Sequence, residues 1–315
     1  IIDSGAPVVS TGNVGVCRDL DMGGFFSGLY ISVGASFKIF GNLNYNGGSI
    51  VTSSSSYFIF AGSTLQTTGG YTPLTVHNIV IANNNGLLMG SNITAYLTLD
   101  LQSGPVYTNN YFFKTASISG YNSTRYVING DNLGNPAIDG GLRLTVPAGG
   151  NTIFPIGPIP GSYNPVTLTN SIGPTETFTA YVTPSGPSQD AVQRTWIVTE
   201  ETAGGNTVDL VLQWDQTHEG TAFNRAMSSV YRSDNGTILN FNGYMPQVGN
   251  PNNPGVSIWS KTLAGITFES AYWVINNETS VLPITLIAFK VIPINEKARI
   301  TWLIDLYSNP DYFEV

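Results

Sequence analysis

The sequence contains few charged residues. Asp, Glu, Lys and Arg make up 10% of its 315 residues, against about 25% in an average soluble domain. Solubility must therefore depend on Asn, Ser, Thr and Gly, which separate the apolar runs. Because a weakly charged surface repels other copies of itself poorly, this composition favours packing into assemblies.

Runs of basic residues and long apolar runs are also missing. The net charge of −8 and the pI of about 4.6 argue against a nucleic-acid partner, since phosphate binding needs clustered Lys and Arg. No stretch approaches the ~20 apolar residues of a membrane-spanning helix, so we expect no transmembrane segment. The chain begins at Ile1 without Met or an apolar leader, as expected of a product of signal peptidase.

Reactive side chains are scarce. The single cysteine, Cys17, excludes an internal disulfide and a site built from several thiolates. We expect Cys17 to be a small buried hydrophobic residue; a redox or intermolecular role is the alternative. Glycine pairs such as Gly47-Gly48 precede no predicted helix, so phosphate-binding and dinucleotide-binding loops are absent and no cofactor is expected.

Short apolar runs separated by Gly, Asn and Ser predict strands and turns throughout the first half of the chain. The runs between residues 29 and 101 are shorter than the usual sandwich strand of about 5–6 residues. Asn-rich turns suit a parallel β-helix, in which stacked Asn side chains hydrogen-bond along the axis. We therefore favour a β-helix over a meander of hairpins, with Tyr45, Tyr57, Phe58 and Phe60 packing in its core rather than forming a platform for sugars.

After residue 149 prolines become frequent and the predicted strands become longer. Strands of this length and spacing predict an antiparallel β-sandwich. Two further strands, at 284–291 and 298–304, are too few for an independent domain. They join the sandwich, begin another module, or complete a neighbouring subunit by strand addition. The predicted fold is all-β, with an N-terminal segment (1–28), a β-helix or solenoid (29–148), a β-sandwich (149–280) and C-terminal β strands (281–315).

Four segments in order resemble large secreted surface proteins of Bacteroidota, often exported by the type IX route. They read LTVHNIVIANNNGLLMGSNITAYLTLDL, ISGYNSTRYVINGDNLGNPAIDGGLRLTVPAGGNTIFPIGPIPGSYNPVTLTN, AVQRTWIVTEETAGGNTVDLVLQWDQTHEGTAFNRA and VLPITLIAFKVIPINEKARITWLIDLYSNPDYFEV. The last resembles the opening strands of a fibronectin-III-like module. The resemblance implies an exported, extracellular or cell-surface protein with a β-helix and a sandwich. It implies no activity, because proteins of this layout serve as adhesins, matrix components and appendage subunits.

The sequence offers few clusters of residues that could form a catalytic or metal site. Asp215, His218 and Glu219 are candidate metal ligands, but we favour a polar loop in which Asp215 or Glu219 lies near Arg225. Glycosidase chemistry needs two carboxylates on one groove, and the candidates are Asp19 with Asp21, Glu200 with Glu201, and Asp100 with Asp131 or Asp139. We interpret Asp19 and Asp21 as turn residues, and Glu200 and Glu201 as neighbours that point to opposite faces of a strand. We expect a protein that is not an enzyme.

The first functional hypothesis is a structural protein that associates with other copies of itself into a surface fibre, sheath or adhesive layer. Its candidate strand-exchange residues are Ile284, Leu286, Phe289, Ile300 and Trp302. The second hypothesis is a carbohydrate-binding adhesin module that contacts surface glycans through Tyr244, Trp259 and Trp273. A glycan hydrolase or lyase ranks last, because few charged side chains lie between residues 29 and 120.

Overall fold

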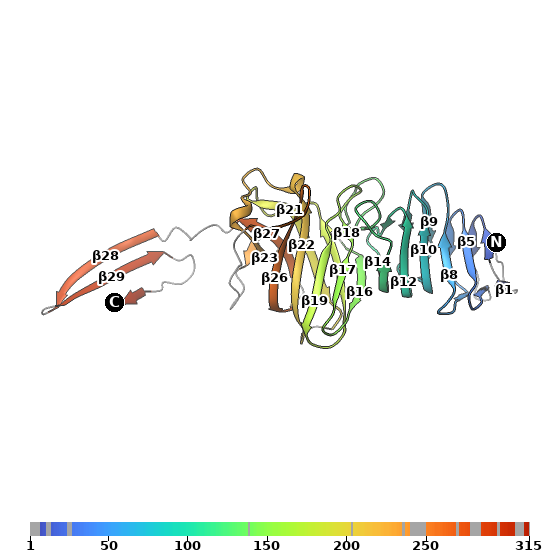
Figure 1. The fold of residues 1–315 in the computed structure, drawn as a ribbon, viewed down its shortest axis with the longest axis horizontal. Helices are drawn as coiled ribbons and strands as arrows, with labels where there is room; N and C mark the ends of the chain where they lie inside the picture. Colours follow the sequence, from blue (N-terminus) through green and yellow to red (C-terminus); the bar gives the residue numbers. More distant parts are fainter. Residues whose placement is uncertain are drawn as a thin grey trace.

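A computed structural model shows an all-β protein, with a β-solenoid of about five turns followed by antiparallel sheets. It describes residues 7–10, 14–23, 27–137, 139–202, 204–234, 237–239, 250–268, 271–277, 285–294, 297–305 and 312–314. In Figure 1 the solenoid runs from the N-terminal end to β16, and the antiparallel strands follow. The predicted all-β class is confirmed, and so is the choice of a β-helix over a meander.

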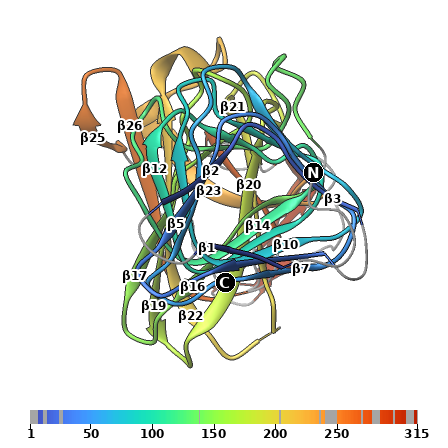
Figure 2. The same ribbon diagram turned by 90° about the vertical axis from the view of Figure 1, so that its right-hand side faces the viewer.

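The solenoid is built from three parallel sheets, to which successive coils contribute strands. Seen along the long axis, the strands of successive coils lie over one another (Figure 2). The first sheet holds β1 (Pro7–Ser10), β4 (Gly28–Ile31) and β7 (Ser49–Val51). The second holds β2 (Val14–Cys17), β5 (Ser36–Ile39), β8 (Tyr57–Phe60), β10 (Leu74–Ala82), β12 (Ile93–Ser103), β14 (Phe112–Ser119) and β16 (Gly141–Val146). The third holds β3 (Leu20–Met22), β6 (Leu43–Tyr45), β9 (Gln66–Gly69), β11 (Leu87–Met89), β13 (Val106–Tyr107), β15 (Val127–Ile128) and β18 (Ile156–Gly157).

Apolar side chains stack inside the solenoid from one coil to the next. Phe37, Phe58, Ile79 and Leu99 are register partners in consecutive coils, and none is more than 5% exposed. The rings of Phe37 and Phe58 are stacked with centroids 6.1 Å apart. Burial of these inward rows supplies most of the driving force for coiling, at roughly 25 cal/mol per Å² of apolar surface.

Of the four aromatic residues expected in the core of the solenoid, three are buried and one is exposed. Phe58 and Phe60 are fully buried and Tyr45 is 7% exposed, but Tyr57 is 44% exposed and lies on the outer side of β8. The reason is the two-residue period of a strand: in the burial pattern of β8 the exposed Tyr57 alternates with the buried Phe58. Cys17 is partly buried and packs against the core.

Amide side chains hold the corners of neighbouring coils together. The buried Asn83 donates from Nδ2 to the carbonyl oxygen of Thr64, at 2.7 Å, and to Oε1 of Gln66, at 3.1 Å. One coil later, Gly104 has a φ of 68°, and a side chain there would meet the carbonyl oxygen of Asn83. An amide–amide hydrogen bond along the axis is therefore present at this corner, although it joins Asn83 to Gln66 and not two stacked Asn side chains as predicted.

The solenoid continues into the antiparallel region without a break in its second sheet. Strand β16 pairs parallel with β14 and antiparallel with β20, which extends this sheet to twelve strands. The added strands are β20 (Glu176–Thr183), β21 (Ala191–Glu200), β27 (Ala271–Asn277), β23 (Ser228–Asp234) and β24 (Thr237–Leu239). A five-stranded sheet accompanies them, with β17 (Asn151–Phe154), β19 (Val166–Ile172), β22 (Thr207–Asp215), β26 (Ile258–Thr267) and β25 (Asn252–Gly255).

The sandwich-like region buries its large aromatic side chains. Trp196, Trp214, Phe154 and Phe178 are fully buried, and β22 alternates strictly between buried and half-buried residues. These side chains belong to the same hydrophobic cluster as the interior of the solenoid. One core therefore runs through both regions.

The last described strands form a small sheet of their own. It consists of β28 (Thr285–Ile294), β29 (Lys297–Asp305) and β30 (Tyr312–Glu314), paired antiparallel in that order. No strand of this sheet pairs with the twelve-stranded or five-stranded sheet among the described residues. The described residues also include two short 3₁₀ helices, η1 (Gln216–His218) and η2 (Arg225–Met227).

Candidate functional site

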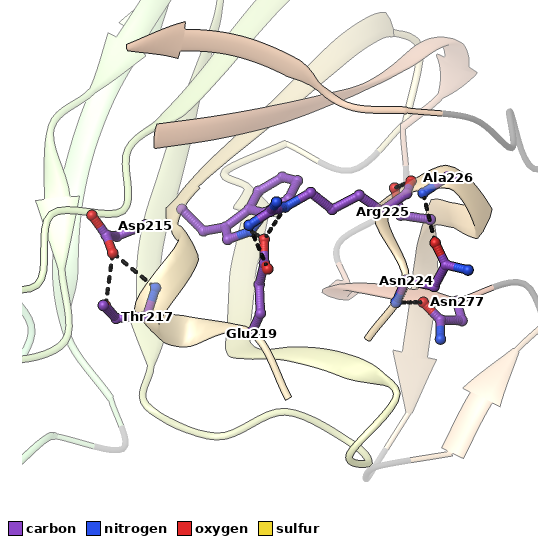
Figure 3. A network of polar contacts seen from close by, with 9 residues as sticks. Asp215, Thr217, Glu219, Asn224, Arg225, Ala226 and Asn277 are labelled. Atoms are coloured by element: carbon purple, nitrogen blue, oxygen red, sulfur yellow. Dashed lines mark hydrogen bonds and ion pairs between the residues drawn. The ribbon is translucent and has the colours of Figure 1, made fainter. Parts of the chain in front are cut away.

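A network of polar side chains lies where β22 ends and η1 and η2 follow (Figure 3). Asp215 caps η1 by accepting hydrogen bonds from the backbone N–H of Thr217, at 2.8 Å, and from its hydroxyl, at 2.7 Å. Asn224 caps η2 through the N–H of Ala226, at 3.1 Å. Each cap satisfies a donor that the short helix leaves open, so these side chains fix the path of the loop.

An ion pair closes this loop. Arg225 donates to both carboxylate oxygens of Glu219, from Nε and from a terminal nitrogen, each at 2.8 Å. Nε1 of Trp214 donates to the same carboxylate at 3.0 Å. The guanidinium lies 4.1 Å from the ring centroid of Trp259, which adds a cation–π contact. The expected local tie between Glu219 and Arg225 is confirmed.

A second polar group lies deeper, between β21, the segment before β19 and η1. Arg194 is 7% exposed and donates from Nε to Oδ1 of Asn164, at 3.1 Å, and from a terminal nitrogen to Oγ of Ser162, at 2.9 Å. Ser162 in turn donates to Oδ1 of Asn164, at 2.8 Å. Because Oδ1 receives these donors, the amide nitrogen of Asn164 points the other way, to Nδ1 of His218 at 3.2 Å.

The pKa values of both ionisable groups in this cluster, Arg194 and His218, are lowered. Burial lowers the pKa of Arg194 to about 10. Burial, followed by the charge of Arg194, lowers the pKa of His218 to about 4. A protonated imidazole would also turn an N–H towards the amide nitrogen of Asn164, which is itself a donor. His218 is therefore neutral at pH 7, with Nε2 3.5 Å from the hydroxyl oxygen of Ser162.

The three candidate metal ligands of this region go to different partners. Asp215 caps η1, His218 faces Asn164 and Ser162, and Glu219 holds Arg225. Within the part of the chain that the structure describes, no group of three or more His, Cys, Asp or Glu side chains could hold a metal ion. These residues build a structural network rather than a metal centre.

The candidate carboxylate pairs are also engaged in structural contacts. Asp19 accepts from the backbone N–H of Asn42, at 2.8 Å, and Asp21 from the side chain of Asn44, at 3.2 Å. Both contacts join adjacent coils. The interpretation of Asp21 as a turn residue is wrong, because Asp21 is the outward-facing residue of β3 between the buried Leu20 and Met22. Glu200 accepts from the N–H of Gly204 and Glu201 from Lys114, so the two glutamates serve different contacts.

The candidate sugar-binding aromatics do not form one platform. Trp273 is 1% exposed and lies in the core, so the prediction that it contacts glycans is wrong: strand pairing directs its ring inward. Trp259 is partly buried beneath Arg225 and, with Glu219, lines a hollow of about 490 Å³. Tyr244 lies outside the described residues.

The candidate strand-exchange residues lie on the separate C-terminal sheet. Phe289 is the register partner of Trp302, Leu286 lies opposite Ile304, and Ile300 lies opposite Val291. Ile284 lies outside the described residues. Three arrangements are expected for these strands. The described residues do not show the first of them, in which the strands join the sheets of the sandwich.

Sequence reasoning missed two groups of side chains. The cluster around Arg194 is assembled from three distant segments, and no local pattern marks it. The contact between Thr52 and His77, at 2.8 Å from Oγ1 to Nδ1, crosses from one coil to the next. Its only trace in the sequence is a separation of 25 residues, which is close to one coil of the solenoid.

Comparisons with protein-family models, with curated proteins and with solved structures find no match to this chain. Among the described residues, no helix has the length and apolar character required to cross a membrane.

Proposed function

We propose that this chain is a structural part of an extracellular bacterial surface protein, and that copies of it associate into a fibre, sheath or adhesive layer. The observation that carries the proposal is the twelve-stranded sheet that runs from β2 to β24 over a single hydrophobic core. A body of this kind resists bending, because bending it would break ladder hydrogen bonds and core packing together. Placement outside the cell rests on the resemblance to secreted Bacteroidota proteins.

The ends of this sheet support self-association. Strands β2 and β24 each have one neighbour in the sheet among the described residues, and the open N–H and C=O groups of an edge strand can pair with another chain. Val14 and Val16 on β2 are 53% and 62% exposed. With only 10% charged residues in the sequence, little electrostatic repulsion opposes such contacts.

Sedimentation velocity of the purified chain over a range of concentrations tests this proposal. We expect a distribution that shifts to larger species as concentration rises. Val14→Lys should reduce the shift, because a lysine on an edge strand opposes edge-to-edge pairing. Val33→Lys is the matched control, since Val33 is 76% exposed but lies in a turn. A single monomeric species at all concentrations would refute self-association, and equal effects of both variants would refute the role of β2.

A further inference from the structure

The outer face of the solenoid carries a hollow of about 390 Å³. Its lining includes Val51 and Thr52 from one coil, Thr75 and His77 from the next, and Tyr96 from the coil after that. The hollow therefore follows the solenoid axis across three coils. None of its residues belongs to the polar groups of the sandwich described above.

An exposed aromatic ring forms one wall. Tyr96 is 58% exposed, and its ring meets that of His77 edge to face, with centroids 5.6 Å apart. Both residues lie where the ladder between neighbouring strands is irregular, because the register shifts between Val76 and Asn78 on β10 and between Ala95 and Thr98 on β12. The contact between the two rings and the bond of His77 to Thr52 hold them in place before any ligand arrives. A tyrosine presented in this way offers a large, rigid and amphipathic contact surface at low cost in entropy.

The polar groups of the hollow are oriented by hydrogen bonds between coils. Thr52 Oγ1 accepts from the backbone N–H of His77, at 2.9 Å, and lies 2.8 Å from its Nδ1. This double contact fixes the imidazole and leaves Nε2 as the ring nitrogen available to a ligand. The hydroxyl of Thr75 also belongs to the lining. Such groups exchange hydrogen bonds with hydroxyl-bearing ligands and fix their orientation.

Asp, Glu, Lys and Arg are absent from the lining of the hollow. The sequence between 29 and 120 contains three residues of these four types, Lys38, Asp100 and Lys114, and none of them lines the hollow. A phosphate, sulfate or carboxylate would lose its hydration there without gaining an ionic partner. The chemistry of the hollow therefore fits an uncharged ligand with many hydroxyl groups.

An exposed strip extends the hollow along the axis. Tyr30 and Val51 are register partners on β4 and β7, and they are 43% and 46% exposed. Coils of a parallel solenoid are about 4.8 Å apart, which is close to the advance per residue of an extended chain of linked hexoses. The strip can thus present roughly one contact for each sugar unit.

We propose that this hollow, with the strip from Tyr30 to Tyr96, binds an extended neutral glycan along the solenoid axis. The site lies on the solenoid, not at the tryptophans of the sandwich, and it goes beyond the structural role without depending on it. An assembled fibre would display one such site on every copy.

An array of neutral and acidic glycans probed with the purified chain gives the first test. Titration calorimetry with the monosaccharides, trisaccharides and hexasaccharides of β-linked glucose, xylose and N-acetylglucosamine gives the second. We expect binding to neutral glycans, with affinity rising from the monosaccharide to at least the trisaccharide. Tyr96→Ala should weaken binding about tenfold or more, and His77→Gln should weaken it less.

Tyr57→Ala is the matched control, because Tyr57 is an exposed tyrosine of β8 outside the lining of the hollow. The proposal is overturned if no neutral glycan binds, if only acidic glycans bind, or if Tyr96→Ala and Tyr57→Ala bind alike. Loss of binding in Trp259→Ala but not in Tyr96→Ala would move the site to the sandwich. Tyr96→Ala should show the same sedimentation distribution as the unaltered chain. Its loss of glycan binding would then be distinguished from a loss of self-association.

Discussion

The neutral His218 makes the stability of the sandwich depend on pH in a predictable direction. Its pKa is lowered from 6.5 to about 4 in the folded chain, while in the unfolded chain it returns to about 6.5. Between these two values the unfolded chain binds more protons than the folded chain. Stability is therefore complete above pH 6.5 and falls as the pH decreases through this window.

The size of the effect follows from the same values. At about 1.4 kcal/mol per pKa unit, the fall from 6.5 to about 4 corresponds to about 3 kcal/mol once the pH has reached 4. His218 is only partly buried, so solvent screening reduces this figure. We expect a loss of about 1–2 kcal/mol between pH 7 and pH 5, where the protonation of carboxylates still contributes little.

Urea unfolding followed by tryptophan fluorescence at pH 7 and pH 5 measures the effect. His218→Gln removes the titrating group and keeps a side chain that can bond to Asn164 and Ser162. The difference in unfolding free energy between the two pH values should be about 1–2 kcal/mol larger for the unaltered chain than for this variant. Equal pH dependence in both proteins would refute the cluster as described.

Three further substitutions test other parts of the fold. Gly104→Ala should destabilise more than Gly149→Ala in thermal denaturation: both glycines have a φ of 68°, which costs about 1–2 kcal/mol, but only at Gly104 would the added carbon meet a backbone oxygen. Equal losses would contradict the stacking of the corners. Phe58→Ala should cost about 3–5 kcal/mol and Tyr57→Ala less than about 0.5 kcal/mol in urea unfolding; the reverse order would contradict the register of β8. Arg225→Ala should cost about 1–3 kcal/mol at pH 7, because it leaves a largely buried carboxylate without its ion pair, and an unchanged unfolding midpoint would contradict that pairing.

The strands were predictable where alternation is regular. The pattern of residues 207–214 predicts a half-buried strand, and β22 spans Thr207–Asp215 with Val208, Leu210, Leu212 and Trp214 buried. In the solenoid, the short apolar runs between Gly and Asn correspond to strands such as β6 and β8. Local sequence suffices here, because burial on one face and turn chemistry act within a few residues.

Contacts between coils were not predictable, because the coils differ in length. Register partners on the third sheet are 25 residues apart between Leu43 and Thr68 but 19 apart between Leu87 and Val106. A shift of one residue would turn each side chain to the opposite face. The meeting of Thr52, His77 and Tyr96 in one hollow depends on these lengths, and so only the folded chain reveals it.

Electron microscopy of the purified chain at high concentration tests the proposed self-assembly most directly. We expect elongated assemblies, in which a reconstruction resolves the twelve-stranded sheet of one copy in contact with the next copy through an edge strand. Discrete single rods at the highest concentration, with no contact between the sheets of different copies, would contradict the proposed structural role.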